Sequence, residues 1–151
     1  MHSGVNVAWK APKSGNVLAC LCEYRGSMKG LLAELKGFRK GDIMQAFSYS
    51  KEAEGALLPA YVNAKLRASE GMARAKDTNM DFMLLVARTM KIDRALAKYG
   101  ASSQRFVFFS ENRRRGRSFL KKHGVRIIKE LELRFDRHIA EDVALSELLE
   151  K

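Results

Sequence analysis

The spacing of apolar residues changes several times along the chain, and each change marks a helix or a strand. The longest organised stretch runs from Thr78 to Gly100. Thr78 and Asp81 have the spacing of a capping box, five apolar residues follow at 82–86, and Gly100 is of the type that closes a helix. The stretch therefore predicts one continuous helix, buried in its first half and half-exposed in its second.

Elsewhere the pattern predicts strands that alternate with helices. Strands are expected at 5–9, 17–24, 42–48, 105–110 and 125–128, and helices at 27–36, 51–70, 111–123 and 135–149. The 105–110 segment is apolar on both faces, which favours an interior strand. Gly37 is expected to end the first helix, Ser50 to cap the second, and Pro59 to kink or break that second helix.

This order of elements predicts an α/β (α+β) fold with helices packed on a small mixed or antiparallel sheet. A chain of 151 residues suits one domain, expected at 17–151 after a loosely structured segment at 1–16. No apolar run reaches the roughly 18 residues that a membrane span needs, and the N-terminus lacks the apolar core of a secretory signal. We therefore expect a cytoplasmic protein without a membrane partner.

The charge changes this picture, because a net charge of +11 and a pI near 9.9 are typical of a protein that binds a polyanion. The cations gather in two places. One is the row Arg88, Lys91 and Arg94, to which Lys65, Arg67, Arg74 and Lys76 could be added, and the other is Arg113, Arg114, Arg115, Arg117, Lys121 and Lys122. Aromatic residues available for stacking on bases are few, namely Tyr49, Tyr61 and Tyr99.

The sequence offers no recognisable catalytic constellation. It lacks a glycine-rich phosphate loop, and its three histidines have no spacing typical of a triad or a metal site. Cys20 and Cys22 lie two apart in a predicted strand and therefore on one face, where buried packing is favoured over metal or redox chemistry. We therefore expect no enzyme activity, no cofactor, no metal and no small-molecule substrate.

From residue 42 onward the order of features resembles a known family. The strand IMQAFSYSKE at 43–52 leads into a helix with spaced alanines, AYVNAKLRA at 60–68. A basic connector then precedes the buried helix MDFMLLVARTM at 80–90, KIDRALAKYGAS follows at 91–102, and the chain ends in IAEDVALSELLEK. Over 42–110 and 136–151 this order is similar to the small kinase-binding subunit of the KEOPS complex, the TPRKB-like family, in its archaeal type.

One segment departs from the family pattern. Members usually carry a Ser-Gly-x-Arg-Gln-Ile turn after the buried helix, whereas residues 87–92 read Ala-Arg-Thr-Met-Lys-Ile. Arg88 replaces the glycine and Met90 replaces the arginine, so the helix is expected to run straighter here, with its cations at Arg88 and Lys91.

The resemblance implies a non-catalytic subunit of the complex that places threonylcarbamoyl on the adenosine beside the anticodon. Such a subunit docks on the N-terminal lobe of the atypical kinase subunit and recruits tRNA through its single-stranded 3′ CCA end. The residues expected to contact tRNA are Lys51, Arg74, Arg88, Lys91 and Arg94, and those expected to dock the kinase are Ala64, Ala68, Leu145, Leu148 and Leu149.

Two other hypotheses stay open at this point. The chain is alternatively a general basic nucleic-acid-binding module that acts through the 112–123 helix, without a kinase partner. A third hypothesis is an unrelated small enzyme, which a deep pocket lined by polar residues would favour.

Overall fold

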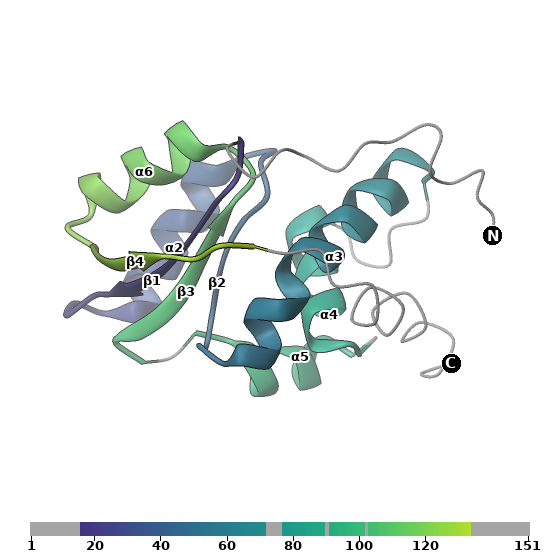
Figure 1. Ribbon diagram of the computed structural model, residues 1–151, viewed down its shortest axis with the longest axis horizontal. Helices are drawn as coiled ribbons and strands as arrows, with labels where there is room; N and C mark the ends of the chain where they lie inside the picture. The colour runs from purple at the N-terminus through teal and green to yellow at the C-terminus, as the bar shows by residue number, and fades with distance from the viewer. Residues whose placement is uncertain (1–15, 72–76, 90, 102, 134–151) are drawn as a thin grey trace.

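The computed structural model describes residues 16–71, 77–89, 91–101 and 103–133, and within them five helices interleave with four strands. In chain order these are β1 (Leu18–Glu23), α2 (Met28–Arg39), β2 (Met44–Phe47), α3 (Lys51–Ser69), α4 (Thr78–Ala87), α5 (Ile92–Tyr99), β3 (Arg105–Ser110), α6 (Arg113–Lys122) and β4 (Arg126–Glu130). The strands form one antiparallel sheet in the order β2-β3-β1-β4 (Figure 1). The expectation of a single α+β domain is confirmed.

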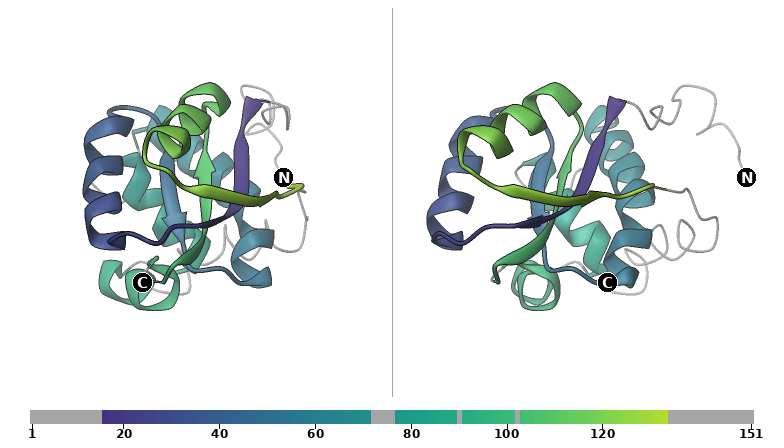
Figure 2. Two further views of the ribbon diagram at one scale, coloured as in Figure 1. Left: turned by 90° about the vertical axis from the view of Figure 1, so that its left-hand side faces the viewer. Right: turned by 60° about the vertical axis from the view of Figure 1, so that its left-hand side comes forward.

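Alternate residues of each strand face opposite sides of the sheet, and each side has its own core. Val107 and Phe109 of β3 pack with α3, α4 and α5, whereas Phe106 and Phe108 pack with α2 and α6. The helices therefore form two layers that enclose the sheet, as the views in Figure 2 show. Because β3 pairs with β1 on one side and β2 on the other, its predicted interior position is confirmed.

Both cysteines lie in the core between the sheet and the α2–α6 layer. Cys20 and Cys22 are fully buried on one face of β1, and their sulfur atoms lie 3.6 Å apart. The contact with Cys20, together with burial, raises the pKa of the Cys22 thiol, so the thiol stays protonated. The predicted role in buried strand packing is confirmed.

Helix α3 confirms one prediction at its start and corrects another in its middle. Ser50 caps the helix, its Oγ accepting from the Ala53 amide at 3.0 Å. The predicted break at Pro59 is wrong, because the helix continues through the proline to Ser69. Buried residues on both sides of the proline pack against α4, and this tertiary packing holds the helix together across the missing backbone bond.

Helix α2 extends further than its glycine suggested. It runs past Gly37 to Arg39, because the last turn is held by another helix. Phe38 packs on Phe119 with ring centroids 5.3 Å apart, and Arg115 donates to the carbonyl oxygens of Phe38 and Arg39. An arginine that satisfies the last carbonyls of a helix stabilises its C-terminal end.

The predicted 78–100 helix is wrong in two respects. The N-cap is Asp77, whose carboxylate accepts from the Met80 amide at 2.7 Å, and not Thr78. The segment is also two helices, α4 and α5, separated at Arg88, whose φ of 57° and ψ of 46° place it in the left-handed region.

Several predictions concern residues outside the described ranges, namely the loose segment and strand within 1–15, Arg74 and the 135–149 helix. Among the helices that the structure describes, none combines the length and apolar character that a membrane span requires.

Candidate nucleic-acid interface

The break between α4 and α5 is a Schellman closure made without glycine. Arg88 donates its amide to the Leu85 carbonyl at 3.2 Å, and Thr89 donates to the Leu84 carbonyl at 3.1 Å. These two bonds satisfy the last carbonyls of α4, and the left-handed residue between them turns the chain away from the helix axis. The sequence does not reveal this turn, because a non-glycine residue occupies a position that glycine usually holds.

After the turn, α5 is a short helix that buries only one narrow stripe. Ala95 and Tyr99 face the core, whereas Ile92 and Leu96 are each 46% exposed. Lys91 precedes the helix, Arg94 and Lys98 lie on it, and all three cations are exposed. The surface of α5 is therefore both cationic and apolar.

A carboxylate on the first turn of α3 ties that helix to the α4–α5 region. Glu52 accepts from Arg88 at 2.6 Å, and the Lys98 ammonium lies 3.6 Å from the same oxygen. Lys51, the first residue of α3, is exposed beside this contact. Four predicted tRNA-contact residues, Lys51, Arg88, Lys91 and Arg94, thus belong to neighbouring elements, whereas Arg74 lies outside the described residues.

The local charge stays positive after pairing. Five cations at positions 51, 88, 91, 94 and 98 stand against three carboxylates at positions 52, 54 and 93, which leaves an excess of two positive charges. Arg88 is the least accessible of these cations to a ligand, because only 18% of its side chain is exposed. Its backbone forms the turn and its guanidinium pairs with Glu52. The other four cations are the better candidates for contact with a polyanion.

A groove of about 470 Å³ lies beside this surface at the β2 edge of the sheet. It is lined by Leu96 and Ala97 of α5, by Leu32 of α2 and by residues of the edge strand β2. The other lining residues are Gln45, Ala46, Ser48, Met83, Gly100 and Ala101. The groove thus links α5 to α2, which belong to opposite layers of the domain.

The side of β2 that faces away from β3 is already bonded within the domain. Met44 donates to the Asn79 side chain at 2.8 Å, Ser48 donates to the Tyr99 carbonyl at 2.8 Å, and Phe47 forms a β-bridge with Gly100. Because strand residues alternate, these contacts lie opposite the pairing with β3. The groove therefore lies beside an edge that the rest of the domain partly covers.

Of the three tyrosines considered for stacking, the structure leaves one at the surface. Tyr49 is 41% exposed and directly follows Ser48, which lines the groove, whereas Tyr61 and Tyr99 are buried. An exposed ring beside cations is the combination that single-stranded nucleic acids use for stacking and phosphate contact.

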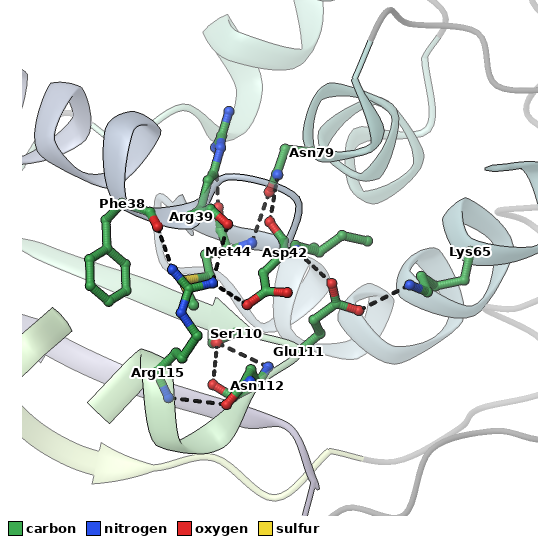
Figure 3. Close-up of polar contacts among 11 residues, drawn as sticks. Phe38, Arg39, Asp42, Met44, Lys65, Asn79, Ser110, Glu111, Asn112 and Arg115 are labelled. Carbon is green, nitrogen blue, oxygen red and sulfur yellow. Dashed lines mark hydrogen bonds and ion pairs between the residues drawn. The ribbon is translucent and has the colours of Figure 1, made fainter. Parts of the chain in front are cut away.

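The second cationic region, on α6, divides into two groups. Arg113 and Arg117 pair with Glu130, the latter at 3.3 Å, and Arg115 pairs with Asp42. Arg115 also stacks over Phe38 at 4.7 Å from the ring centroid and bonds to the end of α2 (Figure 3). These three arginines hold the domain together, and no sequence pattern indicates that their partners lie so far away along the chain.

The outward group on α6 consists of cations with no carboxylate in ion-pair contact among the described residues. Its members are Arg114, Lys121 and Lys122, all exposed. The basic helix therefore offers three charges to a partner, half the number that its sequence displays.

A polar depression near the start of α6 is lined by carboxylates that already have partners. Glu111 accepts from the Ile43 amide at 2.7 Å and the Tyr61 hydroxyl at 2.9 Å, and it lies 3.3 Å from the Lys65 ammonium. Burial, reinforced by the charge of Glu111, raises the pKa of Tyr61. Such fixed pairs do not favour acid–base chemistry, and within the described ranges no three histidine, cysteine or carboxylate side chains gather as around a metal ion.

The structure describes two of the predicted kinase-docking residues, and only one of them is exposed. Ala64 is fully buried and packs in the domain's own core, so the α3 face that carries it is covered by α4. Ala68, one turn later, is exposed. Leu145, Leu148 and Leu149 lie outside the described residues.

Comparisons with known proteins add no relative, since no family model and no curated sequence matches the chain.

Proposed function

We propose that this chain is a non-catalytic subunit of a KEOPS-type complex that recruits tRNA through its single-stranded 3′ CCA end and docks on an atypical kinase. The observation that carries the proposal is the turn at Arg88, which lies where the resembled family has glycine. That residue is left-handed here, so the chain makes a turn of the kind that glycine favours even though the glycine is absent.

The surface beyond the turn supports binding of a single strand. Exposed cations at Lys51, Lys91, Arg94 and Lys98 can meet phosphates, while Tyr49 and the groove beside Leu96 can take unstacked bases. Recognition of unpaired bases by stacking and by their hydrogen-bonding edges is the usual mode for RNA ends.

A set of charge-removing substitutions tests the RNA contact. The end set is Lys51→Gln, Lys91→Gln, Arg94→Gln and Lys98→Gln, which leaves Arg88 and its structural turn intact. It should weaken tRNA binding at least tenfold at about 0.1 M salt, because removing one phosphate contact to a single strand lowers the salt slope by about 0.7. Unchanged affinity in a folded end-set protein would refute the assignment.

Docking on a kinase has its own test. With Ala64 buried, the remaining candidates are Ala68, which is exposed, and the C-terminal leucines, which lie outside the described residues. Deletion of residues 145–151 should release the kinase from the co-purified complex. Retention of the kinase by the truncated chain would contradict this part of the proposal, while leaving the RNA contact untouched.

The alternative module acting through the 112–123 helix fits the contacts less well. Neutralising Arg113, Arg115 and Arg117 would remove the partners of Glu130 and Asp42, and the domain itself would lose stability. Any RNA contact by this region therefore depends on the outward cations alone.

A further inference from the structure

The layer formed by α2 and α6 carries a second positive surface, opposite the layer of α3 and α4. Phe38 of α2 packs on Phe119 of α6, and this contact holds the two helices side by side (Figures 1 and 2). Their outer faces therefore lie on the same side of the sheet.

The charge of this surface is strongly one-sided. Among the described residues, its exposed cations outside ion pairs are Lys29, Lys36, Lys40, Arg114, Lys121 and Lys122, while the exposed Arg117 pairs with Glu130. The only carboxylate within the two helices is Glu34, and Asp42 and Glu130 at their margin are already paired with arginines. Phosphates approaching this side would therefore meet a nearly uniform positive potential.

The outward cations of α6 are spaced so that they lie along one side of the helix. Arg114 and Lys121 are seven residues apart, which places them on the same side of the helix about two turns, or roughly 10 Å, from each other. Ser118 and Lys122 add a hydroxyl donor and a further charge one turn apart. Such a row suits contacts with successive phosphates along a backbone.

Aromatic content separates this surface from the one around α5. No aromatic side chain is exposed on α2 or α6, since Phe38 and Phe119 pack on each other and Phe119 is fully buried. Without a stacking platform, the surface cannot hold splayed bases, and it matches the backbone of a duplex, which proteins recognise by phosphate contact and shape.

The groove connects the two surfaces. Leu96 of α5 and Leu32 of α2 line it together, so a strand lying in the groove ends close to both helices. An RNA whose single-stranded end entered the groove from the α2 side would place its adjoining stem against the α2–α6 layer. From this arrangement we infer that the exposed cations of α2 and α6 bind the backbone of the duplex stem that adjoins the single-stranded end.

This inference rests on the proposed RNA function, and two matched variants separate the two claims. The stem set is Lys36→Gln, Arg114→Gln, Lys121→Gln and Lys122→Gln, and its control is the end set, which removes the same number of charges elsewhere. Both proteins are compared with the unaltered chain on three RNAs: intact tRNA, a single-stranded oligonucleotide with the tRNA 3′ terminal sequence, and a blunt-ended duplex hairpin. Unchanged thermal unfolding confirms that each variant is folded.

The stem set should weaken binding of the hairpin at least tenfold at about 0.1 M salt and reduce the salt slope by up to about 0.9 per substituted cation. Its affinity for the oligonucleotide should stay within twofold of the unaltered chain, and the end set should show the reverse pattern. Equal reductions in affinity with both sets on every RNA would mean a net-charge effect and would overturn the inference.

The remaining outcomes are also decisive. If the unaltered chain binds the oligonucleotide but not the hairpin, the inference about the stem fails and the proposed function stands. If it binds none of the three RNAs, the proposed function fails as well. Binding to vesicles containing phosphatidylserine that the stem set abolishes, without hairpin binding, would assign the surface to a membrane and overturn the inference.

Discussion

Residue 88 offers a test of the turn that shapes the candidate interface. Arg88→Gly and Arg88→Ala both remove the guanidinium and its ion pair with Glu52, so comparison of the two variants cancels that effect. At φ 57° and ψ 46° an alanine is strained by about 1 kcal/mol whereas glycine is not, so the glycine variant should be the more stable by about that amount. In an uninterrupted helix the order would be reversed, because alanine exceeds glycine there by about 1 kcal/mol.

The left-handed turn and the uninterrupted helix therefore predict stability differences of opposite sign between Arg88→Gly and Arg88→Ala. The two predicted differences in unfolding free energy lie about 2 kcal/mol apart. Urea unfolding followed by circular dichroism measures the difference, and a thermal midpoint about 2–4 °C higher for the glycine variant is the matching expectation for a domain of this size. Both variants should bind tRNA alike, since both lack the same charge. A more stable Arg88→Ala protein would refute the left-handed turn and restore the single helix.

Three further substitutions test other contacts. Arg115→Ala should lower the free energy of unfolding in urea by about 2–3 kcal/mol, because it removes the partner of Asp42 and of the end of α2. The neighbouring Arg114→Ala should change stability by less than about 0.5 kcal/mol. Equal effects of the two substitutions would contradict the division of the α6 cations into a paired and an outward group. Asp77→Ala should cost about 1 kcal/mol and Thr78→Ala less than half of that, whereas the opposite order would restore Thr78 as the cap. The raised pKa of Tyr61 favours its neutral form in the folded state, so its contribution to stability is complete below about pH 10 and declines as the pH rises above that value. Tyr61→Phe should therefore flatten the decline of stability above about pH 10 in urea titrations, and an identical decline in both proteins would refute this interpretation.

Much of the fold was accessible from local pattern. The aromatic run at 105–110 predicted an interior strand because residues buried on both faces leave no alternation, and Ser50 predicted a helix start through its hydroxyl cap. Boundaries set by distant contacts were not accessible. Helix α2 passes Gly37 because Arg115, far along the chain, holds its last carbonyls.

The candidate site was predicted in part. The spacing of Arg88, Lys91 and Arg94 predicted one row of cations along a long helix, whereas the structure divides the three residues between a turn and a short helix. Glu52 as the partner of Arg88 could not be foreseen, since the two are 36 residues apart and ion pairs leave no periodic signal. Tyr49 differed from Tyr61 and Tyr99 only in exposure, which the packing of the domain decides.

The most direct test of the central claim compares the affinity of the unaltered chain for intact tRNA and for the same tRNA trimmed of its 3′ CCA, at about 0.1 M salt. Recruitment through the single-stranded end predicts at least tenfold weaker binding of the trimmed tRNA, and the end-set variant should show little difference between the two. Equal affinity of the unaltered chain for both RNAs would contradict the account.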